Sequence, residues 1–227
     1  MLIRKTRHAL QLSSSTVRAF GKPKIFGIGR NKTGTTSLAK ALAEVGIPVG
    51  REYYGDLLIH DWARRDFRRL FLFCHTAQAF QDVPFSWPDT YRALDQHFRG
   101  SKFILTLRDT PDQWYRSLMR FYATIFGNGE SFTLDDLRRS TMVYPGWAYE
   151  ANRMMSNTPE SDPFNKELLI ASYNAHNAAV SNYFGDRPND LLVLNVSEPD
   201  AYNRLCDFLG KPRTEKSFPW ENRTSTR

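Results

Sequence analysis

Two lysines, three glycines and four hydroxyl side chains occupy one short stretch near the start of the chain. Residues 24–38 read Lys-Ile-Phe-Gly-Ile-Gly-Arg-Asn-Lys-Thr-Gly-Thr-Thr-Ser-Leu, an apolar run followed by a polar turn and then by an Ala- and Leu-rich segment. This order predicts a strand, a loop and a helix. Backbone N–H groups in the first turn of a helix have no internal partner, and the helix dipole favours an anion there. Lys32 adds a full positive charge, so we predict a phosphate or sulfate site.

The order of residues in this loop narrows the kind of anion site. Gly29 and Gly34 allow a sharp turn and a close approach to a ligand. The hydroxyls that can donate to its oxygens belong to Thr33, Thr35, Thr36 and Ser37. Lys32 precedes Gly34, so a Walker A loop does not fit, and Lys32 also stands where a dinucleotide loop needs its third glycine. An ordinary strand-to-helix turn is the alternative interpretation.

A second group of polar residues follows another apolar run, residues 102–107. Arg108 ends that run, and Thr110, Pro111 and Gln113 form the pattern of a helix N-cap with a capping box. A guanidinium binds phosphate through two parallel hydrogen bonds, and Ser117 on the predicted helix can donate a third. The alternative for Arg108 is an ion pair with Asp109 or Asp112.

Both groups resemble the sulfotransferases that use 3′-phosphoadenosine 5′-phosphosulfate (PAPS). The segment Lys32-Thr-Gly-Thr-Thr36 resembles their 5′-phosphosulfate loop, and Arg108 with Ser117 resembles their 3′-phosphate site, at a spacing one residue longer than usual. Further similarity in segments such as residues 173–177 extends the resemblance over residues 24–222, although an Arg-Lys-Gly ending is absent. The resemblance implies that PAPS contacts Arg30, Lys32, Thr33, Gly34, Thr35, Thr36, Ser37, Arg108 and Ser117.

The resemblance also implies a mechanism in which Lys32 stabilises the charge that develops on the bridging oxygen. The acceptor needs a base, and two residues are candidates. Asp82 lies between the two phosphate motifs at a predicted strand end, although a turn before Pro84 would equally explain it. His176 is the rival, with a structural role on its helix as the alternative. No pattern of carboxylates or histidines predicts a metal site.

Apolar and helical segments alternate along the chain in the order expected of a parallel sheet. We predict an α/β fold, a P-loop-NTPase-like three-layer domain with a central parallel sheet flanked by helices. The predicted strands are residues 24–29, 79–83, 102–107 and 191–196, and the predicted helices are residues 36–45, 89–98, 111–126, 166–184 and 201–209. Residues 127–162 show no clear hydrophobic periodicity, so we predict a long loop or lid there, or else a packed irregular segment. The aromatic part of this stretch, residues 132–149, suggests an acceptor lid.

Composition sets the remaining expectations. The 227 residues, 41% hydrophobic, predict one domain over residues 24–222, with a basic arm at 1–23 and a tail at 223–227. The arm is either a solvated tail or a targeting segment. No apolar run is long enough to cross a membrane, so we expect a cytoplasmic protein, and nucleic acid is not among the expected partners. Oligomeric state is not indicated.

These observations favour a PAPS-dependent sulfotransferase that acts on a hydroxyl or amine. The acceptor class is left open among small molecules, carbohydrates and lipids. Two alternatives share the anion loop: a nucleotide-dependent kinase or other phosphotransferase, and a noncatalytic nucleotide-binding protein. The loop chemistry alone does not choose among them.

Overall fold

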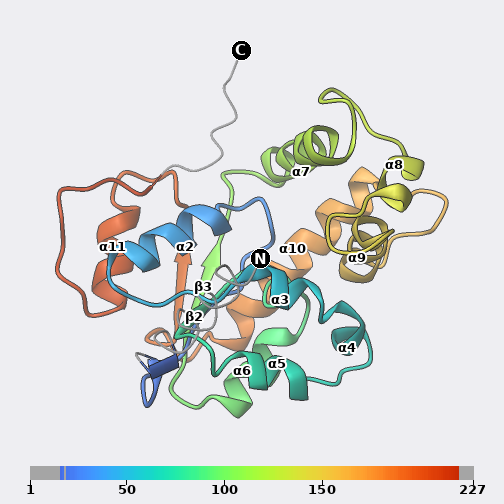
Figure 1. Cartoon of the computed structure of the whole chain (residues 1–227). Coiled ribbons are helices and arrows are strands. Elements are labelled where there is room, and N and C mark those ends of the chain that lie inside the picture. Colours follow the sequence, from blue (N-terminus) through green and yellow to red (C-terminus); the bar gives the residue numbers. More distant parts are fainter. Residues whose placement is uncertain (1–15, 18, 220–227) are drawn as a thin grey trace, which may run out of the picture.

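Four short parallel strands form the central sheet of the protein. The computed structural model describes residues 16–17 and 19–219 (Figure 1), so most of the predicted arm and the whole predicted tail lie outside the described residues. Within the described part the strand order is β2-β1-β3-β4, and every neighbouring pair is parallel. The strands are β1 (Ile25–Gly27), β2 (Ala79–Phe80), β3 (Lys102–Thr106) and β4 (Leu191–Leu194). The predicted parallel sheet is confirmed, with each strand shorter than its apolar run.

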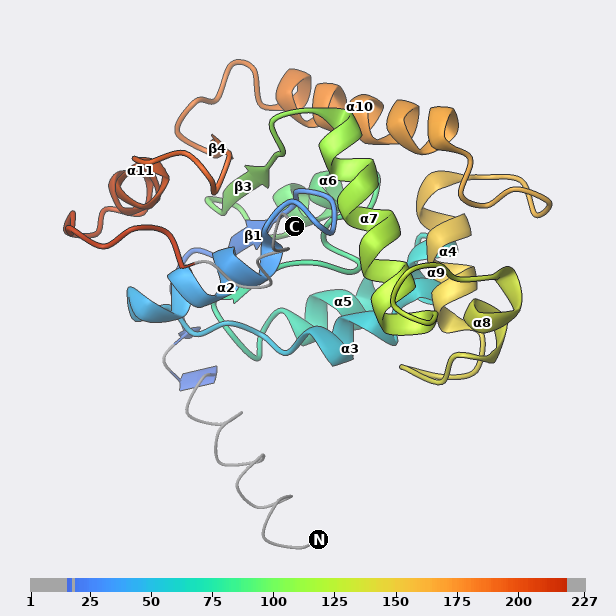
Figure 2. The same cartoon turned by 90° about the horizontal axis from the view of Figure 1, so that it is seen from above.

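Alternate residues of the strands bury into two separate cores, one on each face of the sheet. Ile25 and Ile104 pack with one cluster, and Phe26 and Phe103 pack with the other. Helices cover both faces (Figure 2). The first core lies under α2 (Thr35–Glu44) and α11 (Ala201–Phe208). The second lies under α5 (Arg68–Phe73), α6 (Thr90–His97) and α10 (Lys166–Tyr183). The three-layer α/β architecture predicted from the sequence is therefore confirmed.

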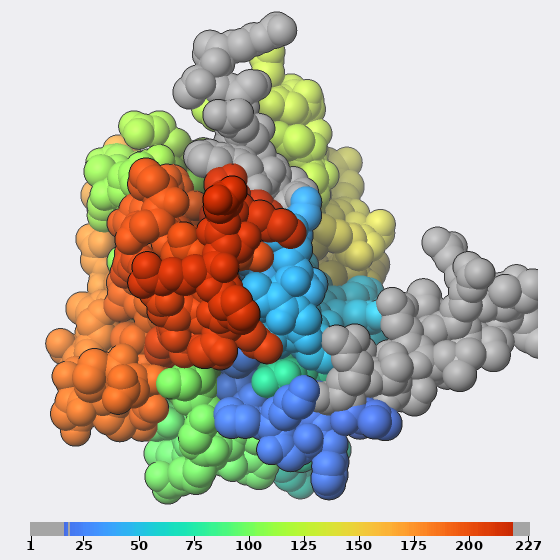
Figure 3. All heavy atoms as spheres, turned by 90° about the vertical axis from the view of Figure 1, so that its left-hand side faces the viewer, coloured from blue at the N-terminus to red at the C-terminus, as the bar shows by residue number. Residues whose placement is uncertain are grey.

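Two helices that lie far apart in the sequence, α2 and α11, cover the first of these faces. Figure 3 shows the C-terminal part, in red, packed beside the blue segment that contains α2. Tyr202 and Leu205 of α11 and Leu38 and Leu42 of α2 belong to the same buried cluster. Helix α2, which follows the loop after β1, is thus held in place along its length by core packing.

A third buried cluster lies among helices beside the sheet. It joins α4 (Ile59–Ala63), α7 (Pro111–Phe126), α8 (Leu134–Arg139) and α9 (Trp147–Ser156). The prediction of an irregular segment over residues 127–162 was wrong, because it contains α8 and α9. Thr133 and Asp136 form a capping box at the start of α8, and Trp147, Ala151 and Met155 bury one face of α9 at helical spacing.

The short helices between residues 52 and 73 were also missed. They are α3 (Glu52–Asp56), α4 and α5, with five or six residues each. Helices of this length do not span enough turns to show a periodic pattern, and tertiary packing supplies their stability. No helix within residues 16–17 and 19–219 combines the length and apolar character needed to cross a bilayer.

The parallel sheet places the segments that follow each strand at one edge. The loop before α2 follows β1, Asp82 follows β2, Arg108 follows β3 and Val196 follows β4. The carboxyl edge of an open α/β sheet is where such folds bind ligands. α7 begins at Pro111 with Thr110 as its N-cap, as predicted, and the Gln113 N–H donates to Thr110 Oγ1 at 3.1 Å.

We expect Gly29→Ala to destabilise the fold by about 1–3 kcal/mol, the range for overpacking. A Cβ at Gly29 would lie 2.2 Å from Thr106 Oγ1 and 2.4 Å from Thr106 O, because β1 and β3 run side by side there. Urea unfolding measures the change. Gly185→Ala is the matched control, since its nearest contact would be an ordinary 3.4 Å. Equal stabilities for the two variants would contradict this close approach.

Candidate functional site

The loop between β1 and α2 turns sharply through two left-handed residues. Lys32 has φ 68° and Gly34 has φ 101°. A Cβ at Gly34 would also lie 2.5 Å from a methyl group of Val196. Glycine is therefore required there for both its conformation and its size. Lys32 carries its left-handed conformation with a full side chain, which stores strain of the kind found at functional sites.

The first turn of α2 faces the cavity. α2 begins at Thr35, no side chain caps it, and its first turn holds no acidic residue. Helix N–H groups in this turn have no partner within the helix. Thr36 and Ser37 line the cavity with Thr35. The predicted sequence of strand, loop and helix is confirmed, and the loop presents the donors that an anion requires.

Side chains from α7 and α10 hold the loop from behind. Trp114 Nε1 donates to Asn31 O at 2.9 Å, and the Trp114 ring stacks on Tyr173 with centroids 4.5 Å apart. His176 Nε2 lies 2.8 Å from Ile28 O and donates to it, because a carbonyl oxygen can only accept. Burial, and after it the Arg30 charge, lowers the pKa of His176 to about 3, so the ring is neutral. These contacts fix the carbonyl groups of the loop.

The side chains of three residues predicted to act on the ligand are buried behind the loop backbone, and none of the three lines the cavity. Arg30 is 1% exposed, its Nη2 donates to Ser172 Oγ at 3.0 Å, and burial lowers its pKa to about 9. Thr33 is fully buried and bonds to Arg30 O and Thr106. His176 is 4% exposed. Their geometry favours a supporting role for all three.

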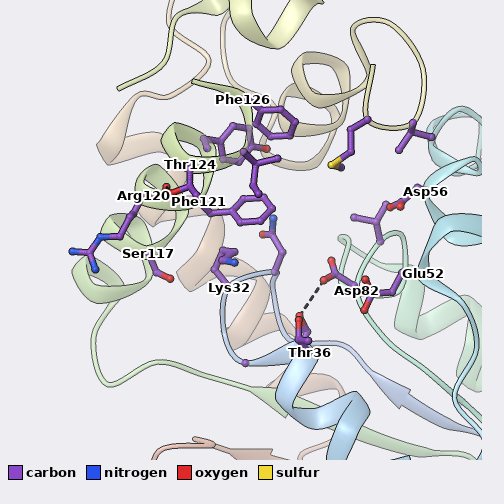
Figure 4. Close-up of a pocket in the computed structure, with 18 of the residues that line it drawn as sticks. Lys32, Thr36, Glu52, Asp56, Asp82, Ser117, Arg120, Phe121, Thr124 and Phe126 are labelled. Carbon is purple, nitrogen blue, oxygen red and sulfur yellow. Dashed lines mark hydrogen bonds between the residues drawn. The ribbon is translucent and has the colours of Figure 1, made fainter. Parts of the chain in front are cut away.

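The other predicted residues meet in one cavity of about 730 Å³ (Figure 4). This volume lies within the usual range for small-molecule sites. Sequence-predicted residues in its wall are Lys32, Gly34, Thr35, Thr36, Ser37, Asp82, Arg108 and Ser117. Segments that follow β1, β2 and β3 thus converge with α2 and α7, although they lie far apart in the sequence.

Arg108 and Ser117 form one side of the cavity. Arg108 Nε donates to Lys32 O at 2.7 Å, so the Arg108 side chain holds the backbone of the loop. The ion pairs considered from the sequence are not formed: Asp112 pairs with Lys166 at 2.7 Å, and Asp109 accepts a hydrogen bond from Gln113. Arg120 lies about one helical turn after Ser117 on α7 and adds another cation to this side of the wall.

Lys32 lies between this basic side and an acidic side. Its Nζ is 3.9 Å from the centroid of the Phe121 ring, a cation–π contact. Burial lowers the pKa of Lys32, Arg108 lowers it further, and Asp82 opposes the shift. The ammonium is therefore poorly solvated, and an incoming anion would gain a strong electrostatic interaction with it.

Three carboxylates form the acidic side of the wall. Asp82 Oδ2 accepts a hydrogen bond from Thr35 Oγ1 at 3.0 Å, so the residue after β2 is joined to the helix that follows the loop. Glu52 accepts a hydrogen bond from Gln81 Nε2. Asp56 completes the group from the other end of α3. Figure 4 shows all three facing the cavity across from Ser117 and Arg120.

Burial and mutual repulsion shift the protonation of these carboxyl groups. The pKa of Asp56 rises to about 7, first because of burial and then because of the Asp82 and Glu52 charges. Burial also raises the pKa of Asp82 and of Glu52. Groups with pKa values near neutrality are suited to accept and release protons.

The sequence did not reveal Glu52, Asp56 or Phe121. The two acids lie on a five-residue helix without a period, and Phe121 is one of sixteen phenylalanines. Only the tertiary fold brings them into the cavity that Lys32 lines. Within the described residues no three His, Cys, Asp or Glu side chains are close enough to hold a metal ion.

We expect Asp82→Asn to lower the pKa of Asp56 below about 7, because Asp82 raises that pKa more than Glu52 does. Carboxyl ¹³C chemical shifts followed from pH 4 to 9 measure the shift. Asp186→Asn is the control, since Asp186 does not contribute to the Asp56 shift. An unchanged Asp56 titration in Asp82→Asn would contradict the electrostatic coupling of the acidic side.

The raised pKa of Asp56 also makes the stability of the fold depend on pH. Because the Asp56 pKa is raised above its usual 3.8, the folded state binds the proton more tightly than the unfolded chain. The contribution of Asp56 to stability is therefore greatest at low pH and is lost as the pH rises through about 4 to 7.

Comparison with known proteins adds one positive result. A family model described as a sulfotransferase domain matches residues 24–227. The match begins at the residue before β1 and includes the anion loop, both sides of the cavity and every strand of the sheet. Among curated proteins the chain has no match.

Proposed function

The chain belongs to the sulfotransferase domain family, and from that premise we propose that it transfers a sulfuryl group from PAPS to a hydroxyl or amine of an acceptor. One observation carries the proposal: two anion-binding groups line the same cavity. The first comprises Lys32 and the N-terminal turn of α2, and the second comprises Arg108 and Ser117. PAPS has two matching anionic groups, the 5′-phosphosulfate and the 3′-phosphate.

The hydrogen-bond donors of each group also suit the anion that we assign to it. Lys32 and uncapped helix N–H groups suit a phosphosulfate, and a guanidinium beside a serine hydroxyl suits a phosphate. Arg108 also holds the Lys32 carbonyl at 2.7 Å. A nucleotide bound at one group would therefore find the other already positioned, which reduces the ordering cost of binding.

PAPS supplies the sulfuryl group, and the residues of the chain stabilise its transfer. The bond between sulfur and the bridging phosphate oxygen breaks, a bond from sulfur to the acceptor oxygen or nitrogen forms, and the acceptor proton moves to a base. Lys32 stabilises the negative charge left on the bridging oxygen; a preorganised donor of this kind contributes about 3–4 kcal/mol. Adenosine 3′,5′-bisphosphate leaves.

We assign the proton acceptor to Asp82. Its carboxylate lines the cavity, and its hydrogen bond to Thr35 fixes it relative to the anion loop. Burial raises its pKa, which strengthens it as a base. His176 is the weaker candidate, because its Nε2 is engaged by Ile28 O and its low pKa makes it a poor base.

We expect Arg108→Ala to weaken binding of adenosine 3′,5′-bisphosphate by about 10- to 100-fold, the usual range for a lost hydrogen bond to a charged group. Calorimetric titration measures it, with ADP and Mg²⁺ as the competing ligand. Arg116→Ala, an exposed arginine on the same helix, is the control. A wild-type preference for ADP with Mg²⁺ would instead assign the protein to the phosphotransferases.

Because Arg108 also bonds to the loop, a second ligand separates its two roles. Adenosine 5′-phosphate lacks the 3′-phosphate, so its affinity should fall less than that of the bisphosphate in Arg108→Ala. Equal losses for the two nucleotides would show that Arg108 acts only by holding Lys32.

We expect Lys32→Ala to lower the rate of PAPS turnover by about 10²- to 10³-fold, with a much smaller change in nucleotide affinity, because its charge is needed most in the transition state. Release of adenosine 3′,5′-bisphosphate, followed by chromatography, measures the rate. Lys40→Ala, exposed on α2, serves as control. Retained turnover in Lys32→Ala would refute the mechanism, and nucleotide binding without turnover in wild type would indicate a noncatalytic protein.

A further inference from the structure

The wall of the cavity changes character from one side to the other. Ser117 and Arg120 lie on one side and Glu52, Asp56 and Asp82 on the other, as Figure 4 shows with Lys32 between them. The basic side meets the requirements of the anionic nucleotide. The acidic side repels anions, so it is available to the second substrate of the reaction.

Apolar side chains also line the cavity, and one of them, Trp147, donates a hydrogen bond from Nε1 to Asp56 O at 2.9 Å. They come from α7, from the segment between α8 and α9, and from the start of α9: Phe121, Tyr122, Phe126, Val143 and Trp147. Tyr122 and Trp147 are buried in the cluster that joins α7 to α9. Phe121, Phe126 and Val143 pack against the same cluster, so the wall is continuous with the core and suits a preformed binding surface.

The same surface continues to the outside. Tyr53 is 54% exposed, Ile125 is 49% exposed and Met142 is 46% exposed, and all three line the cavity. They come from α3, from the end of α7 and from the segment after α8. A single exposed apolar side chain is ordinary, but three that converge on one cavity form an apolar lip, the name used below for these residues.

Two chemical classes of acceptor do not fit these walls. An anionic acceptor would be repelled by three carboxylates in a poorly solvated site. A free sugar can place only some of its hydroxyl groups on the acidic side, and Ile125, Met142 and Phe126 offer the others no hydrogen-bond partner. A hydrocarbon body, in contrast, would exchange water for contact along the apolar wall and lip.

We infer that the acceptor is a lipophilic molecule whose apolar body lies along the apolar lip and wall, and whose hydroxyl or basic amine reaches the side formed by Glu52, Asp56 and Asp82. This inference rests on the proposed function for the reaction itself. It concerns binding, so its test does not require turnover. A hydroxyl donates a hydrogen bond to a carboxylate, and an ammonium forms an ion pair with it.

The test uses three probes that share one alkyl chain and differ in the charge of the head group: octylamine, 1-octanol and octanoate. Glucosamine is the fourth probe, with an amine but no apolar body. Each is titrated calorimetrically into the protein, both free and saturated with adenosine 3′,5′-bisphosphate. We expect octylamine, 1-octanol or both to bind at least about tenfold more tightly than octanoate and glucosamine.

Two sets of variants locate the binding. Ile125→Ser with Met142→Ser should weaken the alkyl probes by about fivefold through lost apolar contact, with adenosine 3′,5′-bisphosphate affinity unchanged. Leu72→Ser is the control, since Leu72 is 70% exposed and lies outside the cavity wall. Asp56→Asn should weaken octylamine more than 1-octanol, which distinguishes the amine from the hydroxyl.

Tight binding of octanoate or glucosamine would overturn the inference, as would alkyl binding that the lip variants leave unchanged, or no alkyl binding to a protein that binds the nucleotide. Failure of adenosine 3′,5′-bisphosphate to bind would overturn the proposed function separately, because the alkyl probes are also titrated into nucleotide-free protein.

Discussion

The rigidity of the loop before α2 is the constraint on which the site depends. Its carbonyl groups are held by side chains from three other elements: Ile28 O by His176, Asn31 O by Trp114 and Lys32 O by Arg108. Without these bonds the left-handed backbone at Lys32 would be free to relax. The loop is therefore preorganised by the helices packed behind it, and the donors that face the cavity require little ordering when an anion binds.

The second property of the site is the separation of charge across one small cavity. Lys32 is close to Arg108 on one side and to Asp82 on the other, and each changes its pKa. The same fold feature produces both neighbours, because β1, β2 and β3 are parallel and end at one edge. In the reaction we propose, an anionic donor and an acceptor that loses a proton need opposite electrostatic surroundings, and the segments that follow these strands place both kinds of side chain in one wall.

Local sequence predicted the parts of the structure that local physics determines. Apolar runs marked all four strands, and Thr110 with Pro111 marked the start of α7. The loop was recognised because lysine, glycine and hydroxyls stand in consecutive positions. Arg30 and Thr33 also stand in that run, yet their side chains turn inward. Sequence gives the order of residues in a loop, whereas the direction of each side chain depends on what packs behind it.

The acidic side and the apolar lip could not be predicted from the sequence, because both depend on tertiary packing. Glu52 and Asp56 lie on a helix too short for a periodic signal, and Ile125 and Met142 belong to segments that meet only in the folded protein. The prediction of a lid over residues 132–149 located part of this region but not its helices. Packing of α9 against α4 and α7 in one buried cluster determines where this region lies.

A crystal structure with adenosine 3′,5′-bisphosphate tests the central claim most directly. The account predicts that the 5′-phosphate contacts Lys32 and the first turn of α2, that the 3′-phosphate contacts Arg108 and Ser117, and that the loop backbone keeps its present conformation. A nucleotide bound in the reverse orientation, outside the cavity, or with the loop rearranged would contradict a preorganised site for PAPS.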